Sequence, residues 1–286
     1  MPNSEQKKKT NAFLAMHTDP GTVLLPNVWD AASARIIEDA GFPAIATTSA
    51  GIAFANGFPD GQKISASQML AAVARIALAV SVPVTADVEA GYGETPELAA
   101  DTARQVIEAG AAGMNFEDAT GDASRPLTEL SLQLERIKAI REVARKSDVA
   151  LVLNARTDFY LLQVGEASKR YDEAVRRLAA FRDAGADCVF VPGIRDIETI
   201  RRVVRDLKCP VNILAVPGSP SVQELAELGV KRISLGSGPM RAAMGMLRTI
   251  AEELKTAGTY DQMASAPSHA AMNQLMTAKS KPETEN

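Results

Sequence analysis

Two acidic residues, one position apart, follow a short β-branched run and are the first candidates for chemistry. Asp87 and Glu89 come after residues 84–86 and before a turn that contains Gly91 and Gly93. On a strand that continues past Asp87, the two carboxylates would point the same way and reach one ligand. The glycines permit backbone conformations that side chains disfavour. The stretch therefore predicts an oxygen-rich site for a hard divalent cation, and it suits a strand running into a polar loop equally well.

A repeated pattern indicates the elements that would position these carboxylates. Four times, an acidic, alanine-rich helix ends at a glycine and leads into a short apolar strand; the glycines are Gly41, Gly110, Gly185 and Gly229. A glycine at this place is typical of a helix C-cap. Apolar strands without polar alternation are typical of a parallel sheet that is covered on both faces.

With four further strand candidates, the pattern predicts a (β/α)8 TIM barrel. These strands are expected at residues 22–27, 82–87, 150–156 and 210–215, and helices alternate with them. About 250 residues in eight β/α units is the usual size of this barrel. An open doubly wound sheet is the alternative, but no Gly-x-Gly-x-x-Gly sequence follows the first strand.

The chain ends are expected to add helices to the barrel. We place the barrel at residues 1–257, with a covering helix at 4–16. Residues 258–286 predict a helical extension over 260–279 and a frayed, charged tail. An apolar stripe in this extension would cover a second subunit or the chain's own barrel; it is formed by Met263, Met272, Leu275 and Met276.

The composition limits the partners and the compartment. The chain has 286 residues, is 46% hydrophobic and carries a net charge of −4. The negative charge argues against nucleic acid or an anionic membrane as a partner, and no apolar run approaches the roughly 20 residues that span a bilayer. No apolar segment of a secretory signal follows Lys7, Lys8 and Lys9. Cys188 and Cys209 are interpreted as core thiols, so we expect a cytoplasmic protein.

In a TIM barrel the carboxyl ends of the strands form the active-site rim. Carboxylates at that rim suit Mg²⁺, with Mn²⁺ as a substitute, and an arginine fork suits a ligand carboxylate. The rim therefore predicts a small dianionic acid held on a divalent cation. The expected rim residues are Asn27, Thr48, Ser49, Ala50, Gly51, Asp60, Asp87, Glu89, Glu117, Asp118, Asn154, Arg156, Asp158, Pro192, Gly193, Asn212, Gly236, Ser237 and Gly238.

Some acidic and basic residues near the rim have a second interpretation. Asp118 and Asp158 could cap turns or pair with Arg156. Asp122 and Arg125 lie in a loop that would form a lid over the site or remain solvated. Both interpretations stay open at this point.

Other catalytic classes lack their residues. His17 lies in the N-terminal helix region and His269 in the C-terminal extension, so zinc chemistry and a Ser-His-Asp triad are poorly supported. A Schiff-base aldolase needs a lysine at the rim, whereas no lysine ends a strand and Lys231 begins one.

Five segments resemble the phosphoenolpyruvate mutase/isocitrate lyase superfamily. They are NVWDAASA at 27–34, SAG at 49–51, DVEAGYG at 87–93, FED at 116–118 and NARTD at 154–158. The resemblance extends over most of the chain. It implies an α/β barrel that binds Mg²⁺ and an α-keto or α-hydroxy acid through an enolate-like intermediate. It also implies a homo-oligomer, a dimer or a tetramer with swapped C-terminal helices.

The resemblance implies a role for each acidic rim residue. Asp87 would be the direct metal ligand, while Asp60, Glu89 and Glu117 would bind the water shell of the metal. Glu117 would also take part in catalysis. Glu89 stands where an aspartate is more usual in the family.

The resemblance also implies the residues that bind the substrate. Ser49, Ala50 and Gly51 would hold the substrate carboxylate and the enolate oxygen with hydroxyl and backbone donors. Arg156 would bind the substrate carboxylate, and Asn212 would line the far wall. Ser49 and Arg156 would be catalytic as well.

The loop after Asp118 departs from the family pattern. Family lyases carry a Lys-Lys/Arg-Cys-Gly-His sequence there, whereas residues 119–126 are ATGDASRP, which also lacks the lysine and asparagine of a phosphonomutase. We therefore expect the under-characterised, oxaloacetate decarboxylase-like branch. Its members would be Mg²⁺-dependent lyases that cleave a C–C bond of a small α-keto or α-hydroxy dicarboxylic acid. A phosphonomutase or phosphonopyruvate-type hydrolase, and a barrel that only binds keto acids, are the alternatives.

Overall fold

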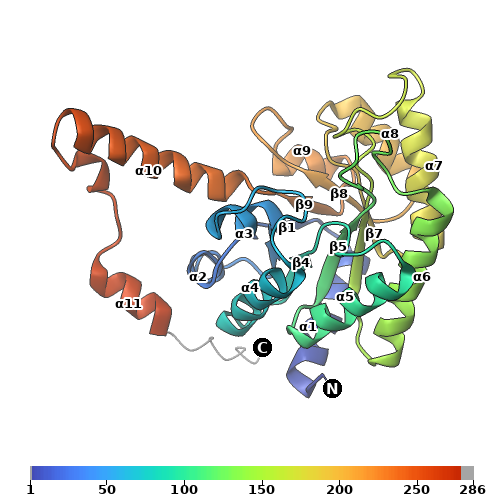
Figure 1. The fold of residues 1–286 in the computed structure, drawn as a ribbon, viewed down its shortest axis with the longest axis horizontal. Helices are drawn as coiled ribbons and strands as arrows, with labels where there is room; N and C mark the ends of the chain where they lie inside the picture. The colour runs from blue at the N-terminus through green and yellow to red at the C-terminus, as the bar shows by residue number, and fades with distance from the viewer. Residues whose placement is uncertain (1, 278–286) are drawn as a thin grey trace.

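The computed structural model describes residues 2–277, and its strands form one parallel sheet that curves into a ring (Figure 1). The order in the sheet is β1-β9-β8-β7-β6-β5-β4-β3-β2. The strands are β1 (Val23–Leu25), β2 (Asn27–Val28), β3 (Ile45–Thr47), β4 (Val84–Asp87), β5 (Gly113–Glu117), β6 (Val152–Arg156), β7 (Cys188–Phe190), β8 (Val211–Leu214) and β9 (Arg232–Ser234).

Pro26 divides the first strand of the barrel into β1 and β2. β1 pairs with β9, and β2 pairs with β3, in both cases in parallel. Proline has no N–H to donate, but the Pro26 carbonyl accepts a hydrogen bond from Ala46 N at 3.1 Å. Because β1 and β2 are consecutive, the ring closes through them. The predicted α/β barrel is confirmed.

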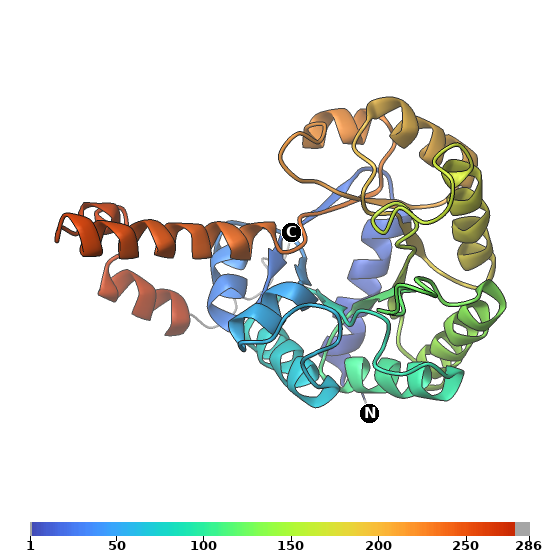
Figure 2. The same cartoon turned by 45° about the horizontal axis from the view of Figure 1, so that its top comes forward.

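Most of the helices surround the ring, while the last ones project away from it (Figure 2). They are α1 (Ser4–Thr18), α2 (Ala31–Asp39), α3 (Ser49–Ala55), α4 (Ala66–Ala79), α5 (Pro96–Glu108), α6 (Leu130–Lys146), α7 (Arg170–Asp183), α8 (Ile197–Leu207), α9 (Val222–Glu227), α10 (Gly238–Thr256), the 3₁₀ turn η1 (Asp261–Met263) and α11 (His269–Thr277).

The turns at the helix ends follow the sequence signals. Asp30 caps α2, and its Oδ1 accepts a hydrogen bond from Ser33 N at 2.7 Å. The four glycines that end the repeated helices all have positive φ, between 83° at Gly229 and 111° at Gly185. Left-handed backbone is the usual reason for a glycine at the end of a helix.

Helix α1 closes the amino-terminal end of the barrel with Phe13. The Phe13 side chain is fully buried and packs with Val23, Leu25 and Val152 from the strands. The approach is close, because a Cβ added to Gly113 on β5 would lie 2.9 Å from Phe13 Cε1. The covering helix expected at residues 4–16 therefore forms the base of the barrel.

The C-terminal segment leaves the barrel along α10 (Figures 1 and 2). After α10 the chain turns through η1, and α11 returns to lie against α2. The predicted helix over 260–279 is therefore interrupted between η1 and α11, and its last two residues lie outside the described residues. Within the predicted stripe, Met272 and Leu275 are partly covered, whereas Met263 and Met276 are exposed.

A search of residues 2–277 finds no helix that combines the length and the apolar character needed to cross a membrane.

Replacing Phe13 by alanine should destabilise the barrel by about 3–5 kcal/mol, because the truncation leaves a cavity under the strands. Phe54→Ala is the control, since Phe54 is 40% exposed; it should change stability by less than about 1 kcal/mol. Urea denaturation followed by circular dichroism measures both. Equal effects of the two substitutions would contradict the role of Phe13 as the base of the barrel.

Candidate active site

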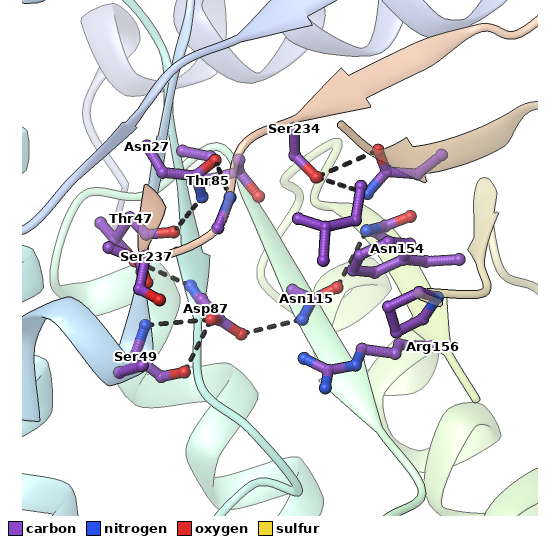
Figure 3. A pocket seen from close by; sticks show the side chains of 18 of the residues that line it. Asn27, Thr47, Ser49, Thr85, Asp87, Asn115, Asn154, Arg156, Ser234 and Ser237 are labelled. Carbon is purple, nitrogen blue, oxygen red and sulfur yellow. Dashed lines mark hydrogen bonds between the residues drawn. The ribbon is translucent and has the colours of Figure 1, made fainter. Parts of the chain in front are cut away.

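A cavity of about 180 Å³ opens among the carboxyl ends of the strands (Figure 3). Of the nine residues for which the resemblance implies a metal or substrate role, six line it, whereas Gly51, Glu89 and Glu117 do not. Its lining is Asn27, Ala46, Thr47, Thr48, Ser49, Ala50, Asp60, Thr85, Ala86, Asp87, Asn115, Asn154, Arg156, Leu161, Phe190, Pro192, Asn212, Leu214, Arg232, Ser234, Gly236 and Ser237.

The Asp87 carboxylate is held by donors on both of its oxygens (Figure 3). Ser49 donates to Oδ2 twice, from its backbone N at 3.0 Å and from its Oγ at 2.7 Å. Asn115 Nδ2 donates to Oδ1 at 2.8 Å. The Asp87 backbone N donates to Thr47 Oγ1 at 2.8 Å. These contacts fix the plane of the carboxylate at the end of β4.

Ser49 can supply two donors because it is the first residue of α3. The first N–H groups of a helix have no acceptor within the helix, so the Ser49 N–H is free for Asp87. Thr48 precedes it as the N-cap and accepts a hydrogen bond from Gly51 N at 3.3 Å.

Asn115 is oriented in turn by a neighbouring amide. Asp87, Asn115 and Asn154 are partners in register on β4, β5 and β6, so their side chains lie in one row inside the barrel. Asn154 Nδ2 donates to Asn115 Oδ1 at 2.9 Å, which leaves Asn115 Nδ2 directed at Asp87. A chain of two amides therefore supports the carboxylate.

Glu89 does not share the direction of Asp87, contrary to the expectation of a continuing strand. β4 ends at Asp87, and Glu89 has a left-handed backbone with φ of 51°. Its carboxylate is 3% exposed and accepts a hydrogen bond from Gln62 N at 2.6 Å. Burial, and then the charges of Asp87 and Asp60, raise the pKa of Glu89 to about 7. Glu89 therefore lies beside the cavity and not in its wall.

Arg156 pairs with two protein carboxylates. Its Nη1 lies 2.8 Å from Glu117 Oε2, and its Nη2 donates to Asp158 Oδ2 at 2.8 Å. Its Nε also donates to Asp158. Burial alone would lower the pKa of Arg156, but the charges of Glu117 and Asp158 raise it. Of the two aspartates that could pair with Arg156, Asp158 does so, whereas Asp118 forms an ion pair with Arg177.

Burial also shifts the pKa of Asp60 and of Glu117, the partner of Arg156. Burial raises the pKa of Asp60, and the charge of Asp87 raises it further. Burial also raises the pKa of Glu117, and the charge of Arg156 opposes that shift. Asp60 lines the cavity, while Glu117 lies behind Arg156.

Gly51 serves packing in this structure. A Cβ on Gly51 would lie 2.5 Å from Thr48 Cγ2 and 3.2 Å from Trp29 Cβ. Its N–H is already bound to Thr48. Of the predicted trio of donors, Ser49 and Ala50 line the cavity and Gly51 does not.

On the far wall, Asn212 is placed as predicted. Its Nδ2 donates to Ser234 Oγ at 3.2 Å, which ties β8 to β9. Asn27 makes a similar tie at the rim, because its Oδ1 accepts from Leu235 N at 2.7 Å and from Gly236 N at 2.9 Å. The backbone at Leu235 and Gly236 is therefore held to the first strand of the barrel.

Comparison with known proteins decides the family. The family model described as phosphoenolpyruvate phosphomutase matches residues 13–255. The chain belongs to this family. The predicted membership of the phosphoenolpyruvate mutase/isocitrate lyase superfamily is thereby confirmed. Similar solved structures include a 2,3-dimethylmalate lyase of that superfamily. It is 29% identical with a TM-score of 0.84, and the match covers 94% of each chain.

Two curated relatives are similar over most of their length. The uncharacterized protein Rv1998c of Mycobacterium tuberculosis is 36% identical, covering 82% of this chain and 84% of the relative. An oxaloacetate decarboxylase of Ectopseudomonas mendocina is 30% identical, covering 91% of this chain and 89% of the relative.

Two further solved structures share the fold. One, from Burkholderia cenocepacia J2315 and described only as a lyase/mutase, is 40% identical with a TM-score of 0.92, covering 97% of this chain and 99% of that one. A phosphonopyruvate hydrolase in complex with oxalate and Mg²⁺ is 25% identical with a TM-score of 0.82, covering 93% of this chain and 94% of that one.

The loop in which this member departs from the family pattern is short and exposed at its tip. Ala119 and Leu127 form an isolated antiparallel bridge at its base. Arg125 lies 3.9 Å from Glu94, and Asp122 accepts a hydrogen bond from Ser124 N at 2.8 Å. Asp122 and Arg125 are not among the residues that line the cavity.

The acidic residues fit a cation that has one main protein ligand. Among residues 2–277 no group of three or more His, Cys, Asp or Glu side chains is arranged to hold a metal ion. Mg²⁺ keeps several waters and is often bound through one or two carboxylates. Asp87 presents a fixed carboxylate in the cavity, and its charge raises the pKa of both Asp60 and Glu89 beyond the effect of burial. A divalent cation would relieve that repulsion.

Most of the polar floor of the cavity was missed from the sequence. Asn154 was expected at the rim, but Thr85, Asn115, Ser234 and Arg232 were not, and all five line the cavity. A usable signal was present for Asn115, because it precedes the rim residue Glu117 by two positions. Residues two apart on a strand share a face.

Glu89→Gln should change how stability depends on pH. The carboxyl has a usual pKa of 4.5 and a pKa of about 7 in the folded protein. Between these values the folded state binds more protons than the unfolded state, so wild-type stability falls as pH rises. Above the pKa of the folded state, wild type has lost all of this pH-dependent stability. Glutamine does not titrate, so the free energy of unfolding of the variant should rise relative to that of wild type by up to about 2–3 kcal/mol between pH 5 and pH 8.

Urea denaturation across this pH range, in EDTA, measures the difference. Glu94→Gln, at an exposed neighbour, is the matched control and should follow wild type. A constant difference between Glu89→Gln and wild type at all pH values would contradict the raised pKa.

Proposed function

We propose that this protein is an Mg²⁺-dependent lyase that cleaves a C–C bond of a small α-keto dicarboxylic acid, by decarboxylation or retro-aldol chemistry. The observation that carries the proposal is the Asp87 carboxylate, fixed by Ser49 and Asn115 at the wall of a small polar cavity. No lysine, histidine or cysteine is among the residues that line this cavity. That lining supports charge stabilisation rather than covalent catalysis.

The family supports the same reaction class. Its members include lyases and mutases, and the relative from Ectopseudomonas mendocina is an oxaloacetate decarboxylase. The absence of the lyase cysteine and histidine from residues 119–126 favours loss of carbon dioxide over cleavage that needs a protein acid on the loop.

Asp87 would hold the cation, with Asp60 and Glu89 acting through bound water. When bound, Mg²⁺ supplies a Lewis acid that stabilises negative charge on substrate oxygens. The similar phosphonopyruvate hydrolase binds both Mg²⁺ and oxalate, which supports this choice of cofactor. The ion pair of Glu117 with Arg156 holds the arginine beside the cation site.

Arg156 and the start of α3 would bind the substrate carboxylate. A guanidinium has five N–H donors, and Arg156 uses three of them on Glu117 and Asp158. The remaining two are available to the ligand. The backbone N–H of Ala50, in the first turn of α3, supplies another donor at the cavity wall.

Oxaloacetate loss should require both the cation and Asp87. We expect turnover with Mg²⁺, after subtraction of the loss in the same buffer without protein, and none in EDTA. Asp87→Asn should lower turnover by about 10²–10³-fold, because it removes the charge that holds the cation. Asp122→Asn, in the exposed loop, should leave turnover unchanged. Undiminished turnover in EDTA and in Asp87→Asn would contradict the proposal.

The similarity to a phosphonopyruvate hydrolase makes phosphonate chemistry the second candidate. Phosphorus NMR of the protein with phosphonopyruvate separates the two reactions. We expect the phosphonate signal to remain constant. Release of inorganic phosphate at a rate above that of oxaloacetate loss would reassign the function to the hydrolase.

We also propose that the C-terminal arm, defined here as residues 238–277, packs against a second copy of the chain. On α10, Met244, Leu247 and Leu254 are 44%, 57% and 46% exposed and follow a helical spacing. Contiguous exposed apolar side chains of this kind usually mark an interface. A second copy suits them because α10 packs on the barrel only at its start and then extends away from it (Figure 2).

Charges on this face should disrupt the assembly. Wild type should be a dimer or tetramer by light scattering coupled to size exclusion. The double substitution Leu247→Glu/Leu254→Glu should shift the mass toward that of the monomer, because burying a glutamate in the interface without a compensating positive charge is costly. Lys255→Glu, also exposed on α10, is the control and should keep the wild-type mass. A monomeric wild type would contradict the proposed interface.

A further inference from the structure

Arg232 is a buried cation on the floor of the active-site cavity. It begins β9, is 2% exposed and lines the cavity. Its Nε and Nη1 atoms are buried and have no hydrogen-bond partner among residues 2–277. Burial lowers the pKa of Arg232 to about 10, so the guanidinium is protonated at neutral pH.

The two cavity arginines differ in what they already bind. Arg156 is paired with Glu117 and Asp158. No protein carboxylate within the described residues forms an ion pair with Arg232. A buried charge without a partner costs several kcal/mol, and native structures rarely leave such a group unsatisfied unless a ligand, ion or water completes it.

The strand register places Arg232 opposite the arginine at the rim. Arg156, Phe190, Asn212 and Arg232 are successive partners in register on β6, β7, β8 and β9. All four line the cavity. Three strand spacings of about 4.8 Å separate the two arginines along the curved sheet. Both long side chains therefore reach one chamber from different sides.

The described residues around Arg232 do not neutralise its charge, so the charge faces the cavity. Below it, the Phe13 ring lies 5.9 Å from the guanidinium carbon and closes the barrel. Beside it, Asn212 and Ser234 bind each other. The Thr85 hydroxyl, also at the cavity wall, is buried without a partner. An anionic oxygen group would satisfy both the guanidinium and this hydroxyl.

We propose that Arg232 binds the second carboxylate of a dicarboxylate substrate and makes the site selective for dicarboxylates over monocarboxylates. This inference rests on the proposed function for the class of acid that enters the cavity. One carboxylate would lie at the Ala50 N–H and Arg156, because both Ser49 donors already bind Asp87, and the other would reach the floor. The cavity, at about 180 Å³, suits a small acid of this kind better than a drug-sized ligand, which fills about 300–1,000 Å³.

A pair of unreactive acids that differ only at the distal carboxylate tests the inference. The probes are malate and 2-hydroxybutyrate, in which a methyl group replaces that carboxylate. Calorimetric titration of the full chain with Mg²⁺ present gives the two dissociation constants. Wild type should bind malate at least about tenfold more tightly, since a charge-assisted hydrogen bond is retained only for malate.

Substitution of Arg232 should remove this preference. Arg232→Gln should weaken malate binding by about 10–100-fold and change 2-hydroxybutyrate binding by less than about threefold. Arg232→Lys keeps the charge and should retain part of the preference. Arg136→Gln is the matched control, because Arg136 is equally buried but lies outside this cavity; it should keep the full preference.

Two outcomes would overturn the inference: no preference for malate in wild type, and a full preference in Arg232→Gln, whether or not both acids bind more weakly to it. If Arg232→Gln fails to fold, the wild-type comparison and Arg232→Lys decide. Failure of the proposed function gives a different result. In that case oxaloacetate is not turned over, whereas the preference for malate and its dependence on Arg232 persist.

Discussion

The orientation of one carboxylate governs the candidate site. Ser49 fixes one oxygen of Asp87 from the start of α3, and Asn115 fixes the other from the next strand. These contacts need β3, β4 and β5 in a single register and need α3 to begin directly after β3. A charge held in this way requires no reorganisation when a ligand arrives, which is how protein dipoles stabilise charge most effectively. The barrel is the scaffold that makes this arrangement possible.

The buried charges around Asp87 lower the stability of the protein without ligand and would favour binding of charged ligands. Glu89 and Glu117 are buried beside it, and burial raises the pKa of each. Arg156 neutralises part of this charge at the rim, while Arg232 stays unpaired on the floor. Such arrangements are costly in a protein without ligand, and they concentrate at functional sites. A cation at Asp87 and an anionic substrate between the arginines would complete both halves of this charge distribution.

The sequence allowed the barrel and most of the rim to be predicted. The helix-glycine-strand repeats work because a glycine at a helix end and an apolar strand are both local signals, as Gly41 and Gly185 show with their positive φ. Asp87 and Arg156 end their strands and line the cavity, because TIM barrels gather strand ends at one rim. Asn212 also lines the cavity, although it is the second residue of β8. The roles assigned to them remain predictions.

Features that depend on register or on backbone conformation could not be obtained in this way. The alternation rule assumed an extended backbone, and no local signal marks the left-handed φ of Glu89. The link of Asn154 to Asn115 becomes visible only when the two strands are in register. Arg232 follows Lys231, which was expected to begin a strand, and its place on the floor of the cavity follows from closure of the ring. The most direct measurement of the central claim is electron paramagnetic resonance of Mn²⁺ bound to the protein with ¹⁷O-labelled oxalate. We predict that the label broadens the Mn²⁺ lines in wild type, and that Asp87→Asn abolishes both binding and broadening; Mn²⁺ bound equally well by both proteins, with no effect of the label, would contradict a cation site at Asp87.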